Sequence, residues 1–344
     1  MNLELQSFLD TAGATSGADG ATAHFGAPAE ELRAARDGSI VCPLDGFGLI
    51  AAAGADAASF LQGQLTCDMR LVDEARSLPG GYCTPKGRLL ALPWILRRDD
   101  RYLLQLPASL LASTLTRLSR YVLRAQVTLE VAPLAMLGLS GPEAPAILEA
   151  AGIPFAAGTG GVSHHGEHTV VRIPGPQPRF MLLAPAAALI ALWPRLTAGA
   201  RPAGAPAWDL LDVLTGLPRV LPETLEEFIP QALNLDLLGG IAFDKGCYTG
   251  QEIVARVHYR GTVKRRCYLA AGPGEPPAPG TPVHGPESAD QAAGHVVLAA
   301  PDPDGGFLCL ASLSQTQAAA GGLHLDADRA LTLRELPYLA AAEG

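Results

Sequence analysis

The chain has 344 residues, of which 48% are hydrophobic and 17% are charged. This length predicts two or three domains, and this hydrophobic content indicates packed cores rather than intrinsic disorder. The net charge of −9 argues against a dedicated nucleic-acid-binding protein, although a local basic patch is compatible with it. No internal repeat is present, which argues against a solenoid.

The hydrophobic residues are not arranged as a membrane-spanning helix. The mean hydropathy is +0.20, but the longest apolar run, residues 180–193, is interrupted by Pro185. A spanning helix needs about 20 apolar residues. The first residues include Glu4 and Asp10 and no basic cluster, so we expect neither a secretory signal nor a transit peptide, and no membrane partner.

The six cysteines are scattered, at positions 42, 67, 83, 247, 267 and 309, and no two form a C-x-x-C pair. This spacing argues against a disulfide framework and against a self-contained zinc or iron–sulfur site. We therefore expect a reducing, cytoplasmic compartment. All cysteines except Cys247 lie in segments expected to form strands or helices, where they would serve packing.

The first two-thirds of the chain alternates short strand and helix patterns. Residues 1–38 are polar and rich in glycine and alanine, which predicts a loosely packed leader. Strands are predicted at residues 39–43, 48–53, 89–96, 101–106, 127–131, 135–139, 169–173 and 179–183. Helices are predicted from Asp56 and at residues 107–124, 142–151, 186–196 and 208–215, with a linker at 197–206.

The last third has a different character. Residues 217–240 are long, irregular and acidic, and they are followed by a glycine-punctuated loop at 243–250 and a helix from Gln251. After Gly261, proline- and glycine-rich loops separate short strands at 264–270, 295–299, 306–311 and 330–336, which predicts a small β-barrel. The whole is an α+β protein rather than a doubly wound fold, since there is no strict βαβα order and no G-x-G-x-x-G.

The densest group of chemistry-bearing residues is the run FDKGCYTGQE at 243–252. Gly246 and Gly250 let the backbone turn sharply and approach a ligand closely. Glycine-rich loops of this kind often surround a reactive or ligand-binding side chain. The same pattern is also compatible with an ordinary turn.

Cys247 is the candidate reactive group of this run. It lies two residues after Lys245, and a helix that starts at Gln251 would place the thiol near a helix N-terminus; both features favour the thiolate. Lys245 and Arg256 could also receive an anionic ligand tail. The alternative is a buried, inert cysteine in a turn.

A basic stretch follows at residues 256–266, RVHYRGTVKRR, with His258 and Tyr259 between its cations. Such a stretch could contact RNA or a polyanionic cofactor tail. The alternative is a solvated strand-and-turn surface, which the acidic net charge favours.

Two further groups of residues are candidate ligand contacts. Trp208 and Phe47 are aromatic residues at the edges of predicted elements, where each could stack on a planar ring or simply pack in a core. His164, His165 and His168 lack the carboxylate-helix context of a metal site, so we interpret them as a polar hairpin tip.

The run KGCYTGQE at residues 245–252 closely resembles the signature of the YgfZ family, folate-binding relatives of the glycine-cleavage T protein. Eight contiguous matching positions make this resemblance specific, and it spans residues 40–270. It continues in FIPQ at 228–231, Asn234, GGI at 239–241, Leu44 and Asp45, GAD at 54–56, QGQ at 62–64, Trp208 and residues 256–261.

The resemblance implies a three-domain ring around a central tetrahydrofolate pocket. The corresponding boundaries are a flexible leader at 1–38, a folate-binding domain at 39–125 plus 205–262, a second α+β domain at 126–204 and a C-terminal β-barrel at 263–344. It implies Cys247 and Lys245 as candidate catalytic residues and no metal ligands. The implied folate-binding positions are Phe47, Trp208, Lys245, Gly246, Cys247, Tyr248, Gly250, Gln251, Glu252 and Arg256. Phe47 stands where the family has a second Trp, which keeps a stacking face but loses the indole N–H.

The chain departs from the T protein at that enzyme's acidic positions. The T protein has N-x-x-G-G-I-x-D-D near its catalytic Asp, whereas residues 84–92 here are TPKGRLLAL, with Ala91 and Leu92 in place of the Asp pair. The T protein's G-Y-T-G-E-D-G-F-E stretch is also absent around residues 165–180. Without an acid or base beside N5 of the folate, aminomethyl transfer loses its proton-handling group.

The resemblance therefore implies a folate-binding protein for the assembly or repair of iron–sulfur enzymes, including those of tRNA modification. The implied cofactors are tetrahydrofolate or a derivative and a transient iron–sulfur cluster, and the partners are iron–sulfur client or assembly proteins. Two alternatives stay open. One is a tetrahydrofolate-dependent aminomethyl transferase, and the other is a factor that binds tRNA directly through residues 256–266.

Overall fold

The computed structural model describes residues 2–286, 292–326 and 329–340. Contacts between residues group the chain into two compact units. Unit 1 comprises residues 1–61, 69–78 and 93–211, and unit 2 comprises residues 62–68, 79–92 and 212–344. No helix among the described residues is long and apolar enough to cross a membrane. The mixture of helices and sheets confirms the α+β class.

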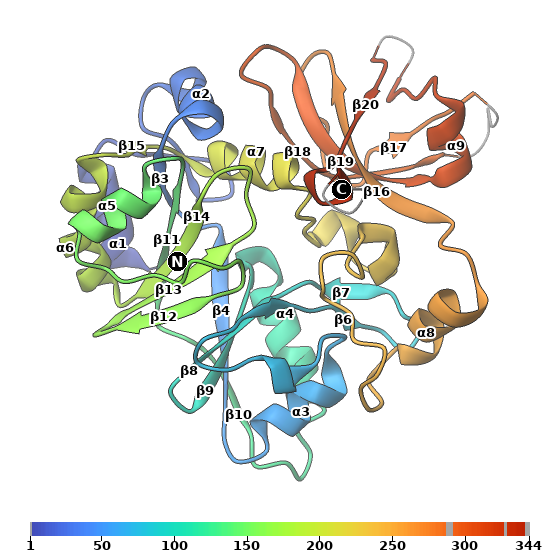
Figure 1. The fold of residues 1–344 in the computed structure, drawn as a ribbon, viewed down its shortest axis with the longest axis horizontal. Coiled ribbons are helices and arrows are strands. Elements are labelled where there is room, and N and C mark those ends of the chain that lie inside the picture. The colour runs from blue at the N-terminus through green and yellow to red at the C-terminus, as the bar shows by residue number, and fades with distance from the viewer. Residues whose placement is uncertain (1, 287–291, 327–328, 341–344) are drawn as a thin grey trace. The chain divides into compact units, whose positions relative to one another are not determined.

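Unit 1 contains a six-stranded sheet buried on both faces. Its strand order is β12 (Val162–His165), β13 (His168–Ile173), β14 (Arg179–Ala184), β11 (Ala135–Ser140), β3 (Ile40–Pro43) and β15 (Arg201–Pro202). One face packs against α1 (Leu3–Thr11), α5 (Ala144–Ala150) and α6 (Ala186–Thr197), with Leu137, Phe180 and Leu189 in the shared core (Figure 1). This apolar layer accounts for the strand pattern seen in the sequence.

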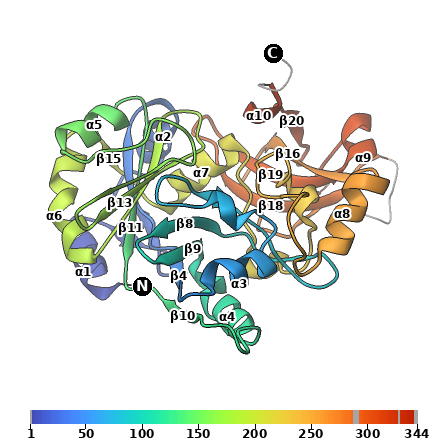
Figure 2. The ribbon, with the colours of Figure 1, turned by 60° about the horizontal axis from the view of Figure 1, so that its bottom comes forward.

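The other face of that sheet packs on α7 (Ala205–Thr215) and on a second, five-stranded sheet. The second sheet has the order β10 (Thr128–Val131), β4 (Phe47–Ala53), β9 (Arg101–Pro107), β8 (Trp94–Arg98) and β5 (Leu78–Pro79). The helix α4 (Ala108–Ser119) contacts β4 and β10 (Figure 2). The chain passes between the units in α3 (Ala57–Gln64) and β5.

Residues 2–38 contain two helices with buried residues, which corrects the expectation of a loosely packed leader. Leu5 and Leu9, four residues apart on α1, are buried in the core of unit 1. In α2 (Pro28–Asp37), the buried carboxylate of Glu31 accepts hydrogen bonds from the backbone N–H groups of Phe25 and Gly204. The low hydrophobic content of this segment hid these contacts, because a single apolar stripe suffices to attach a helix.

Three other expectations differ from the observed elements. The predicted strand at 89–96 is two strands in separate sheets, β7 (Leu89–Ala91) and β8, because Pro93 between them has no N–H to donate to a ladder. The predicted linker at 197–206 contributes β15, which pairs with β3 in parallel. Cys67 lies in a bend rather than in a strand or helix.

Unit 2 contains a curled five-stranded sheet with the order β17 (Pro282–Val283), β18 (Gly294–Pro301), β19 (Phe307–Ser314), β16 (Arg265–Gly272) and β20 (Thr332–Arg334). It is a half-barrel rather than the closed barrel expected, because the edge strands β17 and β20 do not pair with each other. His324 spans part of the open side through single bridges to His284 and Ala330. The helices α9 (Gln315–Ala320) and α10 (Pro337–Ala340) complete the C-terminal part.

The rest of unit 2 carries the glycine-rich loop. It contains the two-stranded sheet of β6 (Tyr82–Cys83) and β7, the short helices η2 (Pro222–Thr224) and η3 (Pro230–Leu233), and α8 (Gln251–Arg260). Residues 217–240 contain η2 and η3 and are otherwise irregular, as the sequence predicted. The three-domain division and the ring stay predictions.

Candidate functional site

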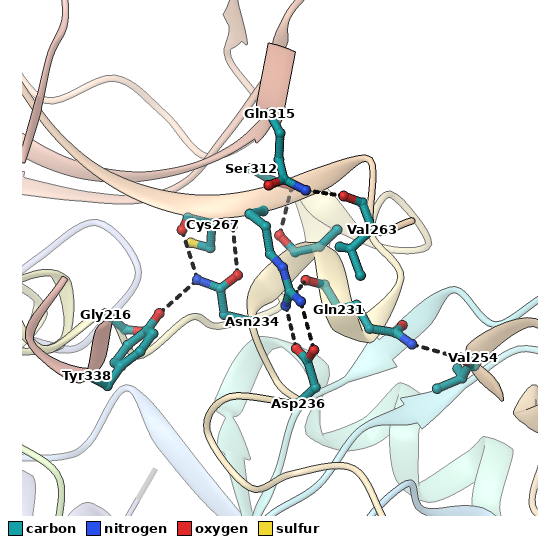
Figure 3. Close-up of polar contacts among 12 residues, drawn as sticks. Gly216, Gln231, Asn234, Asp236, Val254, Val263, Cys267, Ser312, Gln315 and Tyr338 are labelled. Atoms are coloured by element: carbon teal, nitrogen blue, oxygen red, sulfur yellow. Dashed lines mark hydrogen bonds and ion pairs between the residues drawn. The ribbon is translucent and has the colours of Figure 1, made fainter. Parts of the chain in front are cut away.

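The irregular segment before the loop is fixed by polar side chains (Figure 3). Asn234 adopts a left-handed conformation, with φ of 58°. Its amide nitrogen donates to the carbonyl oxygen of Cys267 at 2.8 Å and to the Tyr338 hydroxyl at 2.9 Å, and its amide oxygen accepts from the N–H of Cys267. One side chain thus replaces the backbone ladder that this segment lacks.

A second set of polar contacts ties this segment to β16 and α8 (Figure 3). Arg266 makes two hydrogen bonds to Asp236, at 2.6 and 2.9 Å. Gln231 donates from its amide nitrogen to the carbonyl oxygen of Val254 in α8 at 2.7 Å. Arg266 therefore does not contribute to the basic surface expected at residues 256–266, because its guanidinium is ion-paired with a largely buried carboxylate.

The cysteine loop, residues 243–250, is anchored by Lys245. This lysine is only 7% exposed. Its ammonium donates to the carbonyl oxygen of Leu65 at 2.7 Å and to that of Cys67 at 2.5 Å, and it lies 5.1 Å from the ring centroid of Tyr248. An ammonium held by backbone carbonyls positions the loop; it is not presented to solvent as a ligand for an anion.

Backbone contacts from residues 62–68 complete the anchor. The N–H of Ala242 donates to the carbonyl of Thr66 at 2.9 Å, and the N–H of Thr249 donates to that of Gly63 at 3.3 Å. The hydroxyl of Thr66 donates to the carbonyl of Gly240 at 2.5 Å. The segment QGQ at 62–64, part of the sequence resemblance, is therefore joined directly to the loop.

Gly250 is required where the loop enters α8. It has φ of +86° and begins the helix as its N-cap residue. A Cβ atom at this position would lie 2.6 Å from the carbonyl oxygen of Thr84, so a larger residue would clash as well as be strained. At Gly246, in contrast, a Cβ atom would meet nothing within 4 Å, so this side of the loop is open.

Cys247 is exposed, whereas the other five cysteines are buried. The alternative of a buried, inert cysteine at 247 is therefore wrong. The packing interpretation of the other five is confirmed. Burial raises the pKa of the thiols of Cys67, Cys83 and Cys309 to about 12, which keeps them protonated and unreactive.

The neighbours of Cys247 divide into buried and exposed groups. Tyr248 is buried, and burial raises the pKa of its phenol well above the usual range. Gln251 begins α8, as predicted. Glu252 and Arg256 are exposed and form an ion pair at 3.3 Å one helical turn apart. The loop therefore presents its thiol beside a helix with charged side chains.

Phe47 and Trp208 lie in unit 1, whereas the other predicted folate positions lie in unit 2. Trp208 is 3% exposed, and the guanidinium carbon of Arg179 lies 3.8 Å from the centroid of its ring. A Cβ atom on Gly138 would lie 2.3 Å from the same ring. Both aromatic residues belong to an apolar cluster of unit 1. A folate ring stacked on Trp208 would have to share it with Arg179.

The residues at the positions of the missing Asp pair are apolar, and their surroundings are apolar as well. Ala91 is fully buried in β7, and Leu92 packs against a small cluster formed by Leu235, Ile241 and Val254. His164, His165 and His168 lie on the hairpin of β12 and β13, as expected. Among the described residues, no group of three or more His, Cys, Asp or Glu side chains is arranged to hold a metal ion.

Comparison with known proteins found relatives over most of the chain, although no protein-family model matches it. The chain is 34% identical over 302 residues to the tRNA-modifying protein YgfZ of Sodalis glossinidius, covering 86% of this chain and 92% of that protein. It is 36% identical over 231 residues to the tRNA-modifying protein YgfZ of Photobacterium profundum, covering 67% and 69%.

Among solved structures, the chain resembles the glycine cleavage system aminomethyltransferase T from Bartonella henselae. The TM-score is 0.81, and the structural alignment covers 98% of this chain and 97% of that chain. Sequence identity is 19%, which supports a common fold and no more.

Proposed function

The chain belongs to the YgfZ family, and we propose that it is a folate-binding protein that acts in the assembly or repair of iron–sulfur enzymes, including enzymes of tRNA modification. Its relatives are named tRNA-modifying proteins. The observation that carries the proposal is the exposure of Cys247 on a loop that the buried Lys245 anchors through two hydrogen bonds.

The geometry suits a thiol that meets a partner. A thiolate is the form of cysteine that ligates iron and attacks sulfur. As an iron ligand, Cys247 would supply one thiolate, and the remaining ligands would come from the client or a scaffold protein. As a sulfur acceptor, it would attack the outer sulfur of a partner's persulfide, so that the partner leaves as a thiolate and Cys247 carries the persulfide. Lys245 would be a positioning residue, since its ammonium is held by two carbonyl oxygens.

The residues fit folate only in part. Arg256 is exposed and makes one exposed ion pair, so its guanidinium suits a carboxylate of a folate tail. Trp208 is covered within unit 1, so its stacking role rests on the family resemblance alone. When bound, tetrahydrofolate would supply a one-carbon carrier, and the positions of the missing Asp pair, Ala91 and Leu92, provide no carboxylate beside it.

The test is complementation of a bacterial strain that lacks its own YgfZ-type protein, with the activity of an affected iron–sulfur enzyme as the readout. We expect wild type to restore activity and Cys247→Ser to leave it at the level of the deletion strain. Asp244→Asn is the matched control, because Asp244 is exposed on the same loop and carries no assigned role. Iodoacetamide should modify Cys247 in the folded wild type, which checks that the thiol is accessible.

Other outcomes would overturn parts of the proposal. If Cys247→Ser restores activity as well as wild type does, the thiol is not the reactive group. If wild type accumulates but restores nothing, the iron–sulfur proposal fails. A folate-dependent aminomethyl transferase would then be favoured by the shared fold, and it would be tested by formation of 5,10-methylenetetrahydrofolate from an aminomethyl donor.

A further inference from the structure

Unit 2 contains a cavity of 840 Å³ lined by both basic and apolar residues. Five basic side chains line it, against a single carboxylate, Glu227. The basic residues are Arg88, Arg256, Arg260, Lys264 and Arg265. This local excess of positive charge contrasts with the net charge of −9 of the whole chain, so it is a feature of this surface rather than of the composition.

The cations of the cavity are available to a ligand to different degrees. Among the described residues, the side chains of Arg260 and Lys264 have neither a hydrogen bond nor an ion pair, and both are exposed. Arg265 donates to the carbonyl of Ala293 at 3.2 Å, and Arg88 donates to that of Glu227. Both contacts leave the guanidinium charge uncompensated, since a carbonyl is neutral. Arg256, the fifth cation, is paired with Glu252 at 3.3 Å. The other four, two held by carbonyls and two free, suit an anion with several charges.

Apolar side chains line the same cavity. They include Phe228, Ile229 and Val257. A small inorganic anion gains nothing from contact with these apolar side chains, whereas a nucleotide places its base against apolar groups and its phosphate against cations.

A second cavity, of 310 Å³, adjoins the first along α8. It shares Arg256 and Arg260 with the larger cavity and adds Ala255, Tyr259 and Glu252, whose carboxylate pairs with Arg256. Arg256 and Arg260 are one helical turn apart and therefore lie on one face of α8. Two hollows that share their cations form a track that is longer than a single mononucleotide needs, which favours a polymer.

Tyr259 supplies an aromatic platform in this track. It is 67% exposed, yet its ring is held edge-on by His258, at a centroid distance of 4.7 Å, and by Phe243, at 6.2 Å. Phe243 belongs to the cysteine loop and stacks on His258 at 3.6 Å. An occupant of the track would therefore lie against the same aromatic group that packs on the cysteine loop.

We infer that this basic track, formed by Arg256, Tyr259, Arg260, Lys264 and Arg265, binds a single-stranded segment of tRNA, with phosphates on the cations and a base on Tyr259. The inference rests on the proposed function in tRNA modification. An acidic protein would match the charge but would make no particular use of an exposed ring between two arginines, whereas every nucleobase stacks on such a ring.

The test is binding of a fluorescently labelled tRNA transcript to the full chain, measured by anisotropy at several salt concentrations. We expect Arg256→Glu with Arg260→Glu to weaken binding at least about tenfold and to reduce the salt slope by about 1.4, for two lost phosphate contacts. Tyr259→Ala should weaken binding about tenfold with the salt slope unchanged, because it removes stacking and no charge. The matched control is Arg120→Glu with Arg124→Glu, which changes the net charge equally on an exposed segment of unit 1.

Four results would overturn the inference. They are a failure of wild type to bind tRNA, equal losses in the track and control variants, displacement of tRNA by poly-glutamate as effectively as by poly-uridine, and equal affinity for AMP and for tRNA, which would indicate a small-molecule cavity. Cys247→Ser should bind tRNA like wild type, so a failure of the track and a failure of the thiol proposal are distinguishable. Circular dichroism of each variant checks folding.

Discussion

Unit 1 and the stretch before the cysteine loop in unit 2 are held in place by different interactions, although the curled sheet of unit 2 has an apolar cluster as well. In unit 1, two apolar clusters fill the spaces between sheets and helices, and the fully buried Phe180 and Leu137 are typical members. In unit 2, the stretch before the cysteine loop is fixed by Asn234, Asp236 and Gln231 through bonds to backbone and to Arg266 (Figure 3). The exposed thiol and the basic track both lie in unit 2, next to this polar stretch in the sequence.

This difference explains which segments can keep reactive side chains exposed. Apolar packing buries the side chains that it holds, so a segment fixed in that way has few groups left to present. A segment held by a few directional hydrogen bonds stays irregular and keeps neighbouring side chains exposed. Each such bond then matters individually, because no ladder substitutes for it.

We expect the largest change in the free energy of unfolding from a substitution in the apolar core of unit 1. Phe180→Ala in unit 1 should lower the free energy of unfolding by about 4 kcal/mol, since it leaves a cavity in a fully buried site. Urea denaturation measures this, with Leu3→Ala, at a side chain that is 81% exposed, as the control with little effect. A loss below about 1 kcal/mol would contradict the assignment of Phe180 to a packed core.

A somewhat smaller effect is expected from the polar tether. Asn234→Ala should cost about 3 kcal/mol, because it removes three hydrogen bonds and places alanine at a positive φ. Asn234→Asp keeps the acceptor for the N–H of Cys267 but loses both donors, so its loss should be intermediate. The same urea titration decides. If Asn234→Ala behaves like Leu3→Ala, the polar tether does not stabilise unit 2.

We expect the smallest effect in the pH dependence of the free energy of unfolding. The folded thiols of Cys67, Cys83 and Cys309 have pKa values near 12, above the ordinary value of 9.0. Above pH 9 the unfolded chain releases these protons while the folded chain keeps them, so the free energy of unfolding should fall as pH rises. Cys309→Val should make this fall shallower by about 1.4 kcal/mol per pH unit. Denaturation curves at pH 8, 9.5 and 10.5 measure it, and identical slopes in the two proteins would contradict burial of Cys309.

The sequence by itself determined the local features of this protein. Periodicity predicted most strands and helices because side-chain spacing decides which face an element can bury. The run at 245–252 marked the cysteine loop, and Gly250 proved to be required by its positive φ and its close approach to Thr84. The apolar residues at 91 and 92 were visible directly.

The tertiary structure decided which of these groups are available. Only the folded chain brings Lys245 to the carbonyls of Leu65 and Cys67, nearly 180 positions away, and so makes it an anchor rather than a ligand. Asp236 removes Arg266 from the basic stretch, and burial separates five cysteines from Cys247. Such outcomes depend on contacts between residues distant in sequence, and no local pattern contains the path that brings them together.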